Sequence, residues 1–178
     1  MLDFIYKLAI MLIPFDNLFF APSRGWATIS PILFFIYNVL NIKSTLYIII
    51  KKEYKVVIVI YFLVTYSFGL YLINGIELSN FIDAIQSIVL GISFYIAIIN
   101  RYVIKKNNLE KDICILIKAY YVSFIYGLIK YISLELNINS LLNLFKVIEK
   151  RYYDRVAFSF TEPSFIAMHV FGVMLPVY

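Results

Sequence analysis

Charged residues are scarce in this chain, and cysteine is almost absent. Only 15% of its 178 residues are charged, whereas 62% are hydrophobic. Soluble domains are about 45–50% apolar and about 25% charged, so this composition excludes an ordinary soluble domain and indicates an integral membrane protein. The single cysteine, Cys114, excludes an internal disulfide and a multi-cysteine zinc site. Its apolar surroundings predict a small buried side chain.

Long apolar stretches supply the candidate membrane spans, because a spanning helix needs about 20 mainly apolar residues. The five complete candidates are Phe4–Ala21, Trp26–Ile42, Val56–Asn74, Phe81–Ile99 and Ile113–Leu134. Lys7, Pro14 and Asp16 interrupt the first candidate. We interpret it as an uncleaved span, since Asp3 and the lack of a small-x-small cleavage site argue against a signal peptide.

These spans predict an all-α, polytopic integral membrane protein with five full transmembrane helices and a truncated sixth. The predicted organisation is a five-span bundle over residues 1–134, an extracytoplasmic loop with an interfacial helix over 135–162, and the start of the sixth helix over 163–178. The last stretch is shorter than a full span, so we expect this chain to be the N-terminal part of a longer protein.

Lysines and arginines predict the orientation in the membrane. They gather in two of the predicted connections: Lys43, Lys51, Lys52 and Lys55, then Arg101, Lys105, Lys106 and Lys111. The connection between these two, around Gly75–Asn80, carries Glu77 and no positive charge. The positive-inside rule therefore places both basic loops and the N-terminus in the cytoplasm. A nucleic-acid partner is not expected, because no binding motif accompanies the charge and the aromatic residues lie within spans.

The segment after the fifth span carries four basic residues on the predicted outer face, against the rule that the other loops follow. Its charged residues are Glu135, Lys146, Glu149, Lys150, Arg151, Asp154, Arg155 and Glu162, and the basic ones lie between 146 and 155. Within it, apolar residues at helical spacing over Ile138–Ile148 predict a short helix lying flat in the membrane interface. The basic side chains either hold acidic lipid head groups or face an anionic substrate, which the planar fork of arginine binds well.

Two lysines lie inside the fifth predicted span. We expect Lys118, near the cytoplasmic end, to extend its ammonium group to the membrane surface. Lys130, near the outer end, either does the same or joins the basic outer segment.

The start of the sixth span has the features of a helix N-terminus. Pro163 suits the first helical position because its missing N–H would have no partner there. Glu162 then acts as a helix cap, as a base, or as the partner that holds Arg155. His169, two turns further on, shares roughly its helix face. An ionisable residue inside the bilayer suggests a function, although a hydrogen bond between helices is an equal alternative for this histidine.

The stretch from Arg155 to Ser164 resembles a motif of the bacterial O-antigen and capsular polysaccharide polymerases (Wzy-type), Arg-x-x-Ser/Gly-x-Phe-x-Glu-Pro-Ser. The residues that match it are Arg155, Phe160, Glu162, Pro163 and Ser164, whereas Phe158 stands at the Ser/Gly position and Ser159 at the variable position after it. The opening Ile13-Pro14-Phe15 is also similar to that family. About ten residues carry the resemblance, and the family's members have about twice as many spans.

This resemblance implies a glycosyltransferase of the bacterial cytoplasmic membrane. A glycan would leave its polyprenyl diphosphate carrier and join a sugar hydroxyl of a second lipid-linked repeat unit. The implied catalytic residues are Arg155, Glu162 and His169, and the implied substrate-binding residues are Lys150, Arg151 and Ser164.

No cofactor or metal is expected, since the sequence has no Asp-x-Asp motif and no glycine-rich phosphate loop. The expected partners are the polyprenyl-diphosphate-linked oligosaccharide and membrane lipids, with chain-length regulator and flippase proteins beside them. The alternative is a non-enzymatic membrane transporter or part of a lipid-linked oligosaccharide flippase, a class that often contains internal repeats. No clear repeat is present in this sequence.

Overall fold

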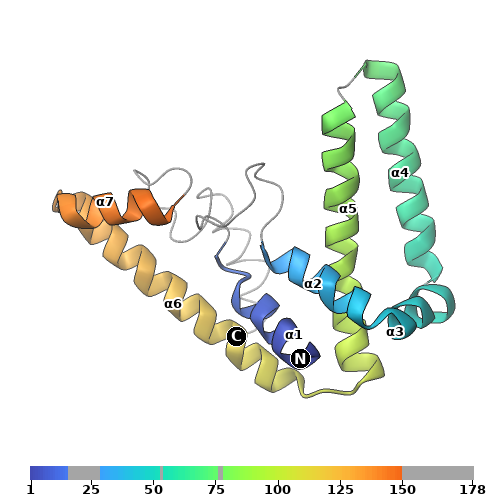
Figure 1. The fold of residues 1–178 in the computed structure, drawn as a ribbon, viewed down its shortest axis with the longest axis horizontal. Coiled ribbons are helices and arrows are strands. Elements are labelled where there is room, and N and C mark those ends of the chain that lie inside the picture. The colour runs from blue at the N-terminus through green and yellow to red at the C-terminus, as the bar shows by residue number, and fades with distance from the viewer. Residues whose placement is uncertain (16–28, 53, 76–77, 150–178) are drawn as a thin grey trace. The chain divides into compact units, whose positions relative to one another are not determined.

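A computed structural model describes residues 1–15, 29–52, 54–75 and 78–149. These residues form helices and turns and contain no β-strand, which confirms the predicted all-α class for this part of the chain (Figure 1). The chain divides into two compact units. The first unit combines the described residues within Met1–Tyr6 and Pro31–Asn108, and the second combines those within Lys7–Ser30 and Leu109–Tyr178.

Two helices have the length and apolar composition of membrane spans. One is α5 (Leu78–Ile98) with its π-helical continuation Ile99–Ile104, and the other is α6 (Leu109–Glu135). A third candidate consists of α2 (Ile29–Leu40) and the following helix up to Lys51, which are bent by 91° relative to each other. By length and composition, two helices among the described residues could cross a membrane, or three with the bent pair, and the count of five plus a sixth stays a prediction.

Besides the bent pair, the first and third predicted spans also differ from the helices at their positions. The first, Phe4–Ala21, begins as α1 (Leu2–Met11), a helix of only 10 residues. Its early end is consistent with Pro14, which lacks the N–H that would continue the helical hydrogen bonds. The third corresponds to α4 (Tyr54–Asn74), whose described apolar stretch Val57–Ile73 lies at the short end of the range for a span.

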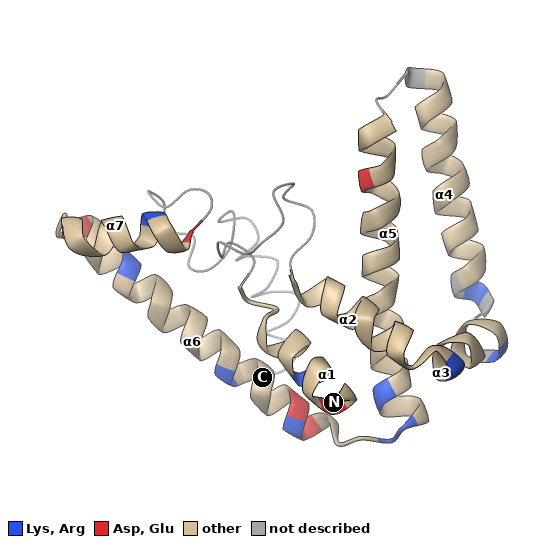
Figure 2. Ribbon diagram, viewed as in Figure 1, with Lys and Arg blue, Asp and Glu red and all other residues tan. Residues whose placement is uncertain are grey.

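Apolar side chains face outward along these helices. On α4, Tyr61 is 73% exposed and Phe62 is 68% exposed. Figure 2 shows that charged residues of α4 and α5 lie near the helix ends and leave the middle of both helices uncharged. Such a surface is favourable in contact with lipid chains and unfavourable in water. Cys114 also lies exposed on α6, so the prediction that its side chain is buried was wrong.

The first unit is held together by a small apolar core and by polar contacts between helices. Ile48 packs against Ile96 and Ile99, which joins the π-helical segment Ile48–Lys52 to the end of α5. The Asn38 amide of α2 donates a hydrogen bond of 2.7 Å to the Ser93 carbonyl of α5. The inward faces of these helices therefore make the contacts that hold the unit together, and the outward faces are apolar surfaces suited to contact with lipid.

The two basic connections are more helical than predicted. After the bend at Asn41, α3 (Ile42–Tyr47) and a π-helical segment occupy most of the expected loop. The Asn41 amide donates to the Tyr37 carbonyl at 2.8 Å, a local hydrogen bond that competes with the regular helix and marks the break. Arg101 likewise does not lie in an exposed loop. It lies in the π-helical continuation of α5 and is only 4% exposed.

The second unit contains a helical hairpin. The helix α6 ends in a left-handed turn at Asn137, where φ is 51°. The Ile138 N–H donates to the Ser133 carbonyl at 3.0 Å and the Asn137 N–H to the Leu134 carbonyl at 3.3 Å, the two bonds of a Schellman motif. The helix α7 (Asn139–Ile148) follows at once, which confirms the short helix predicted for Ile138–Ile148.

Candidate functional site

The strongest polar feature of the second unit is an ion pair between its two helices. The Lys130 ammonium of α6 lies 2.5 Å from a carboxylate oxygen of Glu149, which directly follows α7. Both side chains are fully buried. Isolated ions are very costly to remove from water, so each charge here depends on the other. Lys130 therefore neither reaches the membrane surface nor stands open to a ligand.

Tyr126 completes this cluster from one turn earlier on α6. Its hydroxyl donates a hydrogen bond of 2.6 Å to the other carboxylate oxygen of Glu149. Its ring meets Phe145 of α7 edge-on, with centroids 5.4 Å apart. Tyr126 and Lys130 are four residues apart on α6, and so are Phe145 and Glu149 across the hairpin. Tyr126 and Lys130 lie on one face of α6, and Glu149 follows the end of α7 one turn beyond Phe145, so the four side chains come together.

Glu149 experiences opposing influences on its ionisation. Burial raises the pKa of its carboxyl above the ordinary value of 4.5, while the hydrogen bonds from Lys130 and Tyr126 act to lower it. Because burial is the larger effect, the pKa stays raised. The carboxylate accepts bonds at both oxygens and is closed to solvent, which suits a structural anchor better than a base that exchanges protons with a substrate.

A second buried charge lies in the first unit. The Arg101 guanidinium lies 2.7 Å from an Asp3 carboxylate oxygen and 4.3 Å from the centroid of the Tyr6 ring. This ion pair and cation–π contact join the first helix to the end of the α5 span. The arginine predicted to set the membrane orientation thus also holds the N-terminal helix in place.

Lys105, just beyond that span, is held in a similar way. Its ammonium donates to the Asn41 amide oxygen at 2.6 Å and lies 5.4 Å from the centroid of the Tyr37 ring. Partial burial, together with the charge of Arg101, lowers the pKa of Lys105. The lysine therefore links the bend at Asn41 to the connection that leads to α6.

All six predicted site residues lie outside the described residues: Arg155, Glu162, His169, Lys150, Arg151 and Ser164. Their assignments as catalytic or substrate-binding groups stay predictions. Within the ranges that the structure describes, no group of three or more His, Cys, Asp or Glu side chains is arranged to hold a metal ion. The described residue nearest to them in sequence is Glu149, which precedes Lys150.

Glu149 was not predicted as the partner of Lys130. The sequence did contain an indication of this contact. Tyr126 and Lys130 are four residues apart, as are Phe145 and Glu149, and the short connection between the two helices brings them into antiparallel contact. An acidic residue placed opposite an intramembrane lysine was the partner to look for.

Comparison of the chain with family models, curated proteins and solved structures found no match. The likeness to the polymerases therefore depends on the residues between Arg155 and Ser164 and on the opening Ile13-Pro14-Phe15.

Proposed function

We propose that this chain is part of a membrane polysaccharide polymerase. It would join polyprenyl-diphosphate-linked oligosaccharides at the outer face of the bacterial cytoplasmic membrane, with its N-terminus in the cytoplasm. The proposal combines the sequence motif around Arg155 and Glu162 with two helices of membrane-span character.

The single observation that carries the proposal is the motif from Arg155 to Ser164. The buried Lys130–Glu149 ion pair supports it. It ties the residue just before Lys150 to a helix that has the length of a membrane span. A transferase acting on a lipid-linked donor needs its charged groups at a defined depth, because the diphosphate is fixed at the membrane surface by its lipid chain. The ion pair fixes the residue that precedes the basic segment and so meets this requirement. A segment that only binds lipid head groups would not need its first residue to be held in one position.

The proposed chemistry assigns complementary roles to the charged residues. The acceptor hydroxyl oxygen attacks the anomeric carbon of the donor, and its proton passes to the Glu162 carboxylate, with His169 as the reserve base. The bond from that carbon to the diphosphate breaks, and the departing negative charge is stabilised by Arg151 and Arg155, with Lys150 assisting. Ser164, beside the proline, would donate a hydrogen bond to the substrate.

The test uses the full-length protein in cells whose surface polysaccharide depends on it. We expect Arg155→Ala and Glu162→Ala to abolish long glycan while single repeat units remain on the surface, because export precedes polymerisation. Gel electrophoresis of the glycan shows both products. The controls are Lys51→Ala and Glu110→Ala, two exposed residues outside the motif, which should leave long glycan unchanged.

Two results would contradict the proposal. If both site variants still made long glycan, the catalytic roles assigned to Arg155 and Glu162 would be wrong. Loss of the single repeat units together with the polymer would instead indicate transport of the lipid-linked oligosaccharide.

A further inference from the structure

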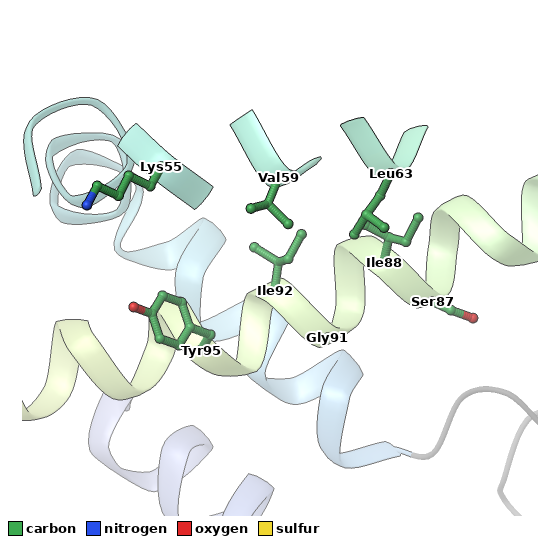
Figure 3. Close-up of a pocket in the computed structure, with 8 residues that line it drawn as sticks. All are labelled: Lys55, Val59, Leu63, Ser87, Ile88, Gly91, Ile92 and Tyr95. Atoms are coloured by element: carbon green, nitrogen blue, oxygen red, sulfur yellow. The ribbon is translucent and has the colours of Figure 1, made fainter. Parts of the chain in front are cut away.

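A groove of about 450 Å³ lies between α4 and α5, inside the first unit. Its volume falls within the range of about 300–1,000 Å³ that is usual for ligand sites. The walls are apolar: Val59 and Leu63 come from α4, and Ile88 and Ile92 come from α5 (Figure 3). The helices contact each other through Phe68 and Phe81 near their joined ends. Figure 1 shows that they diverge away from those ends.

One end of this groove is polar. Figure 3 shows the Lys55 ammonium and the Tyr95 hydroxyl at the same end, with the Val59–Ile92 and Leu63–Ile88 pairs following along the groove. Among the described residues, Lys55 has neither an ion-pair nor a hydrogen-bond partner. The groove thus presents a cation at one end of an apolar trough.

Gly91 opens the α5 side of the groove. A Cβ atom added at this position would meet no atom within 4 Å, so the helix leaves open space where a larger side chain would fit without a clash. Gly69 on α4 has the same open surroundings but does not line the groove. The two glycines therefore form a matched pair for testing what occupies the trough.

We propose that this groove binds one anionic phospholipid, with an acyl chain between α4 and α5 and the phosphate beside Lys55 and Tyr95. Apolar walls alone would not select any lipid in a bilayer, because every lipid tail is equally apolar. The selecting element is the Lys55 ammonium group, which attracts a negatively charged head group at the membrane surface. A zwitterionic lipid lacks that net charge and is bound less well. This inference does not depend on the proposed polymerase activity.

The test measures lipid retained by the purified full chain. The protein is reconstituted in vesicles of equal phosphatidylglycerol and phosphatidylcholine and extracted with detergent, and its bound lipid is identified by native mass spectrometry. We expect one retained phosphatidylglycerol per chain, in preference to phosphatidylcholine. Lys55→Gln should lower that preference about fivefold, the contribution of one lysine near a charged surface. Gly91→Leu should remove the retained lipid of either kind by filling the groove.

The controls separate a defined site from general attraction. Lys51→Gln removes an exposed lysine that does not line the groove, and Gly69→Leu adds the same bulk elsewhere on the hairpin. Both should retain lipid as the unchanged protein does. Val59→Trp fills the groove from α4 and replaces Gly91→Leu if circular dichroism shows that the latter is unfolded. Equal effects of Lys55→Gln and Lys51→Gln, equal retention of both lipids, or lipid retained after the groove is filled would each overturn the proposal.

Discussion

At the scale of single residues, the buried charges have the largest consequences for stability. Lys130 and Glu149 lose their hydration together, and the ion pair with the Tyr126 hydrogen bond offsets that loss. Burial of such a pair contributes little net stability, because the desolvation cost is comparable to the attraction. Removal of one partner is different, because it leaves a buried charge without compensation.

We therefore predict a large difference between single and paired substitutions. Glu149→Gln or Lys130→Met alone should lower the free energy of unfolding by about 3–5 kcal/mol. The double variant Lys130→Met/Glu149→Leu should recover most of that loss, since it leaves no buried charge. Denaturant unfolding of the detergent-solubilised protein, followed by circular dichroism, measures both effects. Lys118→Met is the control, because Lys118 lies exposed on the same helix. Equal stabilities of Lys130→Met and Lys118→Met would show that the ion pair has no such role.

At the scale of the elements, the α6–α7 hairpin depends on the turn at Asn137. Its left-handed conformation is tolerated by asparagine and glycine, whereas a β-branched residue is strained there. The turn sets where α7 begins, and so it determines whether Phe145 and Glu149 meet their partners on α6.

This dependence gives a second prediction. Asn137→Val should lower the free energy of unfolding by about 1–2 kcal/mol, the cost of the left-handed conformation, while Asn137→Gly should be close to neutral. Denaturant unfolding followed by circular dichroism measures both effects. Asn143→Val provides the control, because Asn143 is exposed within α7 and the two residue types have similar helix propensity. A loss for Asn143→Val as large as that for Asn137→Val would mean that the turn conformation is not the cause.

The elements also show what a sequence pattern can predict. The cores of α4, α5 and α6 follow from apolar length alone, and α7 follows from helical spacing. Helix ends do not follow so directly, because local hydrogen bonds decide them. The Asn41 amide introduces a bend, and the contacts of Arg101 with Asp3 and Tyr6 keep that cation within a helix.

The candidate site was less predictable than the fold. The spacing of residues on α6 and α7 is compatible with the Lys130–Glu149 contact. In the sequence, however, Glu149 is only one of several charged residues in a segment that contains both signs of charge. Pairing is a property of three-dimensional geometry, and it becomes visible only once the hairpin turn is known. Arg155 and Glu162 lie beyond the described residues, so their roles still depend on the sequence motif.

At the scale of the whole molecule, the proposed function depends on which side of the membrane carries the basic segment after α7. The earlier connections hold an excess of lysine, which the positive-inside rule assigns to the cytoplasm. In the proposed topology, α6 would carry the chain to the other side, where phosphorylated lipid donors would be met. Arg155 is proposed to act on such a donor and must be accessible from outside.

Labelling of single cysteines tests this orientation. Because Cys114 is the chain's one cysteine, Cys114→Ser supplies a background in which Arg155→Cys, Lys51→Cys or Lys106→Cys is the sole thiol. A membrane-impermeant maleimide on intact spheroplasts should label position 155 at once, and positions 51 and 106 only after permeabilisation. The two lysine positions are exposed and serve as cytoplasmic controls. Labelling of position 155 only after permeabilisation would place the arginine on the side without the proposed donor, and the polymerase assignment would then be wrong.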